Sequence, residues 1–147
     1  MPVPYLTATP AAEAIAFYTR VLGARELVRL TSPDAKIAHA ELAIGDDKIM
    51  LADAYPEMGY ASPRDLGGSP VSLYVRVADV DAVFASAIAA GATERAPVAD
   101  QFDGDRRGSI VDPFGHVWLI ATEREVVSNA ELVRRFERLA GAEEKKQ

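Results

Sequence analysis

The sequence of 147 residues has no cysteine, two histidines and a single tryptophan. Without cysteine, disulfide bonds, thiolate catalysis and sulfur-ligated metal sites are excluded. No apolar run approaches the about 20 residues that cross a bilayer. The first ten residues also lack the basic and apolar regions of a signal peptide. These absences predict a soluble protein, and we expect it to be cytoplasmic.

The chain has few basic residues: it contains 16 lysines and arginines and 22 acidic residues, which gives a formal net charge of −6. This charge disfavours nucleic acids and anionic membranes as partners and is compatible with a cationic ligand. The simpler interpretation is that the acidity serves solubility. Motifs for a serine nucleophile (GxSxG), a phosphate-binding glycine loop or a zinc protease (HExxH) are absent.

What the sequence does contain is one pattern found twice. Thr9 and Asp79 are suited to cap a helix, and Gly23 and Gly91 are suited to end one. Strand-like segments surround each helix: 3–8, 24–30, 35–44 and 47–53 in the first half, and 71–77, 93–102, 106–112 and 116–123 in the second. This order predicts two modules of the form strand–helix–strand–strand–strand (βαβββ).

The repeat divides the chain into four parts. We expect a first module over 1–54, a linker loop over 55–70, a second module over 71–123, and a helix and tail over 124–147. A linker of this length is unusual in a compact domain. In the last part, a helix over 128–141 is predicted, capped by Ser128 and burying an apolar stripe. The stripe consists of Leu132, Val133, Phe136 and Leu139.

Three segments carry a family resemblance: AIAFYTRVLGA (14–24), DVDAVFASAIAAGA (79–92) and GDRRGSIVDPFGHVWLIAT (104–122). In this order and spacing they resemble the vicinal oxygen chelate superfamily of glyoxalases, bleomycin resistance proteins and dioxygenases. The similarity is closest to its PhnB-like branch. The resemblance implies an α+β fold in which two βαβββ modules form an open, curved mixed sheet around a cavity.

Metal-using members of this superfamily take His and Glu ligands from the opening strand of each module and from the last strand. The matching positions are Val3 (or Tyr5, if the strand is shifted by two), Ser72 and Leu119. Leu51 is taken as the first-half counterpart of Leu119. Since none of these is a usual ligand, we predict no bound metal and no cofactor.

The two histidines receive different interpretations. His116 lies three residues before Leu119, and residues three apart on a strand point to opposite faces. We therefore expect it to face away from the cavity and to close a turn or bind backbone carbonyls. His39 and Glu41 share a strand face and could form an acid–base pair that contacts a ligand. The alternative is a satisfied surface pair.

Further ligand contacts are predicted on the opening strands. Ser72, Tyr74 and Arg76 share one strand face, opposite apolar residues that must cover a helix. Tyr5 holds a similar place in the first module. These residues are predicted to line the cavity, while the alternative puts the tyrosines in a core between the modules.

Arg106, in GDRRG, matches an arginine that is usual in the PhnB-like branch. It is included among the candidate ligand contacts. The preferred interpretation is that it pairs with Asp105 or Asp112 and holds the turn, because arginine and carboxylate form strong two-point hydrogen bonds.

These features predict a metal-independent protein that binds or sequesters a small molecule, as bleomycin resistance members do. Whether it is also an enzyme stays open, since a metal-dependent lyase, isomerase or dioxygenase with displaced ligands is the alternative. A third possibility is a structural dimer whose cavity is filled by its own side chains. Open sheets leave unpaired edges and apolar surface, so we predict a homodimer.

Overall fold

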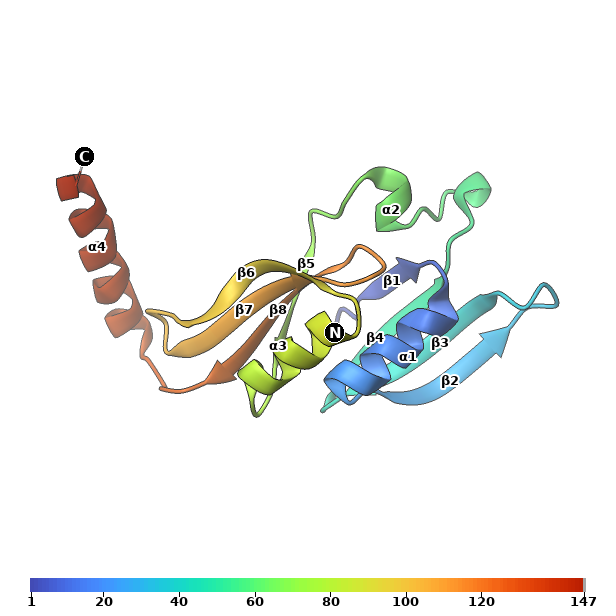
Figure 1. The fold of residues 1–147 in the computed structure, drawn as a ribbon, viewed down its shortest axis with the longest axis horizontal. Coiled ribbons are helices and arrows are strands. Elements are labelled where there is room, and N and C mark those ends of the chain that lie inside the picture. The colour runs from blue at the N-terminus through green and yellow to red at the C-terminus, as the bar shows by residue number, and fades with distance from the viewer. Residues whose placement is uncertain (147) are drawn as a thin grey trace.

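The computed structural model describes residues 1–146 and contains the two predicted modules and the C-terminal helix (Figure 1). The first module comprises β1 (Tyr5–Ala8), α1 (Ala11–Leu22), β2 (Arg25–Thr31), β3 (Ile37–Ile44) and β4 (Asp47–Asp53). The second comprises β5 (Ser72–Arg76), α3 (Val80–Ala89), β6 (Thr93–Asp100), β7 (Asp105–Val111) and β8 (Val117–Glu123). Two short helices, η1 (Pro56–Met58) and α2 (Pro63–Leu66), lie between them, and α4 (Asn129–Lys146) ends the chain. The predicted α+β fold is confirmed.

Each module forms its own open, four-stranded mixed sheet. The strand orders are β1-β4-β3-β2 and β5-β8-β7-β6, so the same topology occurs twice. The opening strand of each module pairs in parallel with the last strand, and the other pairs are antiparallel. As a result β1 and β5 are both edge strands, and both lie toward the middle of the molecule (Figure 1).

The N-termini of α1 and α3 each receive a side-chain hydrogen bond from the last strand of the same module. Asp53 Oδ1 accepts from the Ala11 N–H at 2.9 Å, and Thr122 Oγ1 accepts from the Val80 N–H at 2.8 Å. The prediction that Thr9 caps the first helix is wrong, because the helix begins at Ala11 and no side chain at its N-cap position makes a hydrogen bond. The cap comes from a residue more than 40 positions away, which local sequence rules do not detect.

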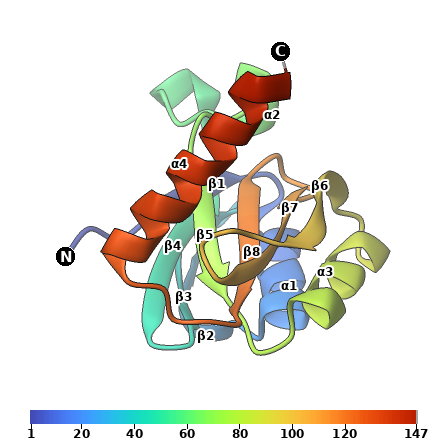
Figure 2. The ribbon, with the colours of Figure 1, turned by 90° about the vertical axis from the view of Figure 1, so that its left-hand side faces the viewer.

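The two modules share one core. Helices α1 and α3 lie side by side (Figures 1 and 2), and the turn before β8 packs against α1. The Tyr18 hydroxyl donates to Asp112 Oδ2 at 2.5 Å, and Trp118 Nε1 donates to the same oxygen at 2.9 Å. Burial, and then the Asp112 charge, raise the pKa of Tyr18 well above its ordinary value. This buried polar cluster fixes one module on the other.

Helix α4 stands at one end of the molecule, apart from α1 and α3 (Figure 1). Ser128 accepts from the Glu131 N–H at 3.2 Å, as predicted for its cap. The predicted burial of the apolar stripe is wrong for the single chain, since its side chains are largely exposed: Val133 55%, Phe136 59% and Leu139 47%. Phe136 contacts Phe102, with ring centroids 6.0 Å apart.

No helix in the described part of the chain has the length and apolar character needed to cross a membrane.

Candidate ligand-binding site

Each sheet has one side that α1 or α3 does not cover, and we call these sides the first and second open faces. Side chains alternate along a strand, so the strand pairing fixes which residues share a face. The first open face carries Tyr5, Thr7, His39, Glu41, Met50 and Ala52. The second open face carries Tyr74, Arg76, Arg107, Ser109, Leu119 and Ala121.

A chain of hydrogen bonds crosses the first open face. The Tyr5 hydroxyl lies 2.8 Å from His39 Nδ1, His39 Nε2 lies 3.0 Å from Glu41, and Lys48 donates to Glu41 at 2.7 Å. Lys48 and then His39 lower the pKa of Glu41, so its carboxylate is ionised and can only accept. His39 Nε2 therefore carries the proton, and in the neutral ring Nδ1 accepts from Tyr5.

Tyr5 opens into a cavity of about 570 Å³. The segment between the modules supplies one wall through Tyr55, Met58 and Tyr60, while Thr7 and Ala52 belong to the sheet. Burial, followed by the nearby Tyr60 and Glu41, raises the pKa of Tyr5, which keeps its phenol protonated. The segment predicted as a linker loop therefore contributes to a cavity, and its aromatic residues were the signal available in the sequence.

On the second open face, Tyr74 and Arg76 converge on a carboxylate. The Tyr74 hydroxyl donates to Asp105, and Arg76 Nη2 donates to the same Asp105 oxygen at 3.4 Å. Arg107 donates to the Tyr74 oxygen at 3.0 Å and to Asp103 at 2.9 Å. Asp105 is only 4% exposed, and its Oδ1 has no partner among the described residues. Sequence analysis missed Arg107 and the role of Asp105.

The two open faces repeat each other at the level of side chains. Tyr5 lies opposite Met50, and Tyr74 lies opposite Leu119. In each module the tyrosine hydroxyl extends across the neighbouring strand to a side chain on the next one. Tyr5 of β1 extends across β4 to His39 of β3, and Tyr74 of β5 extends across β8 to Arg107 of β7. The interior alternative for the tyrosines is not adopted, since Tyr5 is 52% and Tyr74 48% exposed.

This register corrects one matched position. The counterpart of Leu119 is Met50, because both lie opposite the module's tyrosine, whereas Leu51 points to the core and is fully buried. Methionine and leucine thus occupy the two places where the resemblance implied carboxylate ligands. Ser72 lies exposed at the start of β5. Among the side chains that the structure describes, no three acidic or histidine residues gather as a metal site would require.

His116 lines neither cavity. It is buried, and its Nε2 donates to the backbone carbonyl of Thr7 at 2.9 Å, while its own N–H donates to Asp112 Oδ1 at 3.0 Å. The expectation that it binds a backbone carbonyl away from the cavity agrees with this geometry. The carbonyl belongs to β1 of the other module, so His116 ties the modules together.

Arg106 points to the opposite side of β7 from Arg107. It makes a two-point contact with Asp81 of α3 at 2.9 and 3.0 Å, and a further bond to Asp100 at 3.2 Å. These carboxylates raise its pKa. The expected pairing with Asp105 or Asp112 is wrong, because strand alternation turns Arg106 toward the helix. The structure does not bring it to either open face.

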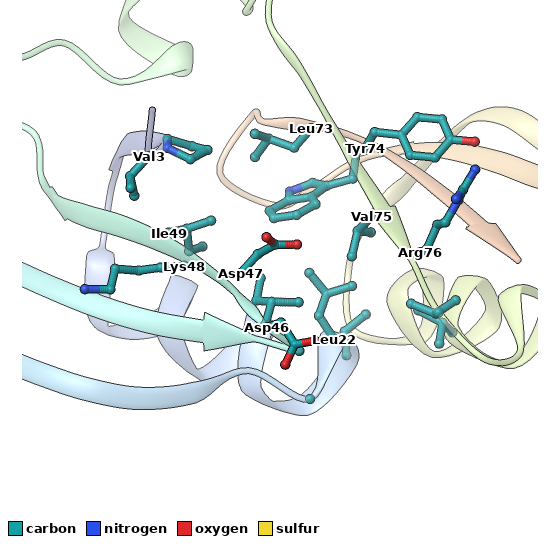
Figure 3. A pocket seen from close by; sticks show the side chains of 18 of the residues that line it. Val3, Leu22, Asp46, Asp47, Lys48, Ile49, Leu73, Tyr74, Val75 and Arg76 are labelled. Atoms are coloured by element: carbon teal, nitrogen blue, oxygen red, sulfur yellow. The ribbon is translucent and has the colours of Figure 1, made fainter. Parts of the chain in front are cut away.

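A second and larger cavity, of about 990 Å³, lies between the modules (Figure 3). It is bounded by the N-terminal residues and the β3–β4 turn on one side and by β5 on the other. Tyr74 and Arg76 lie at its edge. Sequence analysis missed this cavity, since its walls come from parts of both modules whose relative placement no local pattern reveals.

The repeated topology and the paired open faces define a scaffold of two βαβββ modules. The family model described as the glyoxalase/bleomycin resistance protein/dioxygenase superfamily matches residues 6–120. The chain belongs to this superfamily, as its motifs predicted.

Relatives and solved structures extend the match. The uncharacterized protein Rv0887c of Mycobacterium tuberculosis (strain H37Rv) is 45% identical over 118 residues, which cover 78% of this chain and 69% of the relative. The crystal structure of TioX from Micromonospora sp. ML1 is 29% identical, with 87% of this chain and 99% of that chain covered and a TM-score of 0.64. A PhnB protein from Bacillus cereus shares the fold at 19% identity, with 82% and 98% covered and a TM-score of 0.66.

Proposed function

We propose that the protein binds or sequesters a small molecule without a metal, and that the cavity beside Tyr5 is the binding site. The observation that carries this proposal is the composition of the cavity. Aromatic and apolar walls from Tyr55, Tyr60 and Met58 surround a phenol that is already oriented by His39. Ligand pockets commonly combine an apolar lining with a few oriented polar groups, in volumes of roughly 300–1,000 Å³.

The residues at the positions of the family's metal ligands support the proposal that the protein binds its ligand without a metal. Met50 and Leu119 offer no carboxylate to a divalent ion, and Val3 and Ser72 offer no imidazole. Elemental analysis of the dialysed protein is expected to find far less than one equivalent of zinc, iron, nickel or manganese. Near one equivalent of any of them would contradict this part of the proposal.

The binding part is tested by a thermal-shift screen of small molecules, cationic ones included. A ligand at 100 times its Kd stabilises the folded state by about 2.7 kcal/mol. Tyr5→Phe and Tyr60→Ala are expected to weaken binding of any hit, while Val126→Ala, at an exposed position that lines neither cavity, serves as the control. A ligand whose Kd is unchanged by Tyr5→Phe and Tyr60→Ala would bind outside this cavity.

We also propose that the protein acts as a homodimer. The exposed stripe on α4 and the free edges of β2 and β6, the outer strands of the two sheets, support this, since unpaired edges and apolar patches favour pairing with a second copy. Light scattering at micromolar concentration is expected to give twice the monomer mass of 15.8 kDa. The monomer mass would contradict it.

The Tyr5–His39–Glu41 chain favours one second candidate, an enzyme that transfers protons. Its geometry follows the logic of a nucleophile–histidine–carboxylate triad, in which the carboxylate fixes the tautomer and the ring accepts a proton from the hydroxyl. If a hit from the screen is turned over, His39→Gln and Glu41→Gln are expected to abolish turnover while the Kd changes little, because neither residue lines the cavity itself. Unchanged turnover in both variants would remove this candidate.

A further inference from the structure

The cavity between the modules has an apolar floor made of partly and fully buried side chains. Leu73 and Val75 face it from β5, Ile49 from β4 and Leu22 from the end of α1 (Figure 3). Trp118, the sole tryptophan of the chain, also lines it. A floor of this kind is suited to the hydrocarbon part of a ligand, because contact there removes apolar surface from water.

The rim of the same cavity carries uncompensated negative charge. Asp46, in the β3–β4 turn, and Asp47, at the start of β4, line the cavity, and neither makes a side-chain hydrogen bond or an ion pair with the described residues. Figure 3 shows both carboxylates beside the apolar floor. Together they concentrate part of the net negative charge of the chain at one cavity.

Of the three cationic groups in the lining, Lys48 and Arg76 already have carboxylate partners, while the Met1 amino group makes no ion pair with the described residues. Lys48 is bound to Glu41 at 2.7 Å and extends away from the cavity (Figure 3). Arg76 is bound to Glu123 at 3.0 Å and to Asp105 at 3.4 Å. Two free carboxylates, Asp46 in the β3–β4 turn and Asp47 at the start of β4, therefore outnumber the one cation without a carboxylate partner, and the cavity keeps a net negative charge.

We infer that this cavity is a second binding site, distinct from the cavity beside Tyr5, and that it takes hydrophobic cations. The ligand class is an organic ammonium or phosphonium ion with a bulky apolar body. Its body would lie on the floor formed by Trp118, Leu73 and Val75, and its charge would lie near Asp46 and Asp47. An anion of the same shape would meet the same floor and the opposite field.

Two probes of nearly the same shape and opposite charge test this site. Tetraphenylphosphonium and tetraphenylborate are titrated into the purified protein, with calorimetry giving the Kd and Trp118 emission reporting contact in this cavity. The cation is expected to bind at least about tenfold more tightly and to change the emission, because two carboxylates attract one and repel the other. Added salt is expected to narrow the difference.

Charge-neutralising variants locate the effect. Asp46→Asn combined with Asp47→Asn is expected to weaken cation binding at least about fivefold and to remove most of the preference over the anion. Glu13→Gln combined with Glu94→Gln removes the same net charge at exposed positions that line neither cavity, and is expected to change the Kd less than twofold. Tyr5→Phe is expected to have no effect, which separates this site from the proposed one.

Several results would overturn the inference. They are equal binding of both probes, an unchanged Kd in the Asp46/Asp47 variant, a loss of equal size in the Glu13/Glu94 variant, or no response of Trp118. Cation binding that disappears as the protein concentration rises would also overturn it, since a second copy of the chain would then be the occupant of the cavity.

Discussion

Glu41 is the residue whose charge organises the first open face. It accepts from Lys48 and from His39, and these two contacts hold the pKa of its carboxyl below the ordinary value of 4.5. A group with a lowered pKa in the folded state stabilises that state above its unfolded pKa and loses this contribution as the pH falls through the folded pKa. Acid should therefore weaken the contacts of Glu41 only as the pH falls through this lowered pKa.

The corresponding prediction concerns pH. Between pH 6 and about pH 3, the free energy of unfolding of the wild type is expected to fall more than that of Glu41→Gln. Urea unfolding at both pH values measures the two differences. Glu26→Gln, which removes an exposed carboxylate bound to Arg29, is the matched control and should behave like the wild type. Equal acid sensitivity of Glu41→Gln and the wild type would show that the contacts of Glu41 contribute nothing.

His116 gives a second prediction at this scale. His116→Ala removes a buried donor to the Thr7 carbonyl, so the free energy of unfolding should fall by about 1–3 kcal/mol. The Kd of any ligand in the cavity beside Tyr5 should stay within twofold. Chemical denaturation and titration of the same variant check both halves, and a lost ligand with unchanged stability would place the histidine in the binding site.

At the scale of single elements, local rules worked where the deciding contact is local. Gly23 ends α1 in the left-handed conformation, with φ of 67°, and Asp79 and Ser128 accept hydrogen bonds at the starts of their helices. They failed at Thr9, because the N-terminus of α1 is satisfied from β4. The burial of the stripe on α4 also failed, since the helical period predicts an apolar side but not what covers it.

Asp53 is expected to contribute strongly to the stability of the first module. Its two oxygens accept from Ala11 and Ile37, so one buried carboxylate holds both the start of α1 and the start of β3. Asp53→Ala should lower the free energy of unfolding by about 2–4 kcal/mol. Asp79→Ala should cost about 1 kcal/mol or less, because Thr122 also holds the start of α3. Equal losses in the two variants, measured by urea unfolding, would contradict the double role of Asp53.

For the whole molecule, the repeat in the sequence was enough to predict the fold but not the site. Strand alternation placed His39 and Glu41 on one strand face, and Ser72, Tyr74 and Arg76 on another, but it did not bring Tyr5 to His39. It could not bring Tyr60 and Tyr5 to one cavity, or Asp46 and Trp118 to the other, because this depends on how separate segments are positioned in three dimensions. The partners of Arg106 were missed for the same reason, as Asp81 lies on a helix that packs across the strand.

The exposed apolar stripe on α4 leads to a prediction about the proposed homodimer. Phe136→Asp puts a charge in the exposed apolar stripe and is expected to shift the protein from dimer to monomer. Arg134→Asp puts the same residue at an exposed position of the same helix outside the stripe and should leave the dimer intact. Light scattering on both variants measures whether each one is a dimer or a monomer. A dimer that survives Phe136→Asp would move the interface to the sheet edges.

The alternation of the strands has a consequence for how such a protein can change. On β1, Leu6 and Ala8 belong to the shared core, while Tyr5 and Thr7 between them belong to the cavity. The same holds on β4, where Leu51 is core and Ala52 is cavity. Substitutions that alter recognition are thereby separated, residue by residue, from substitutions that unfold the chain. A scaffold divided in this way can acquire a new specificity through single changes, each of them tolerated, without passing through an unstable intermediate.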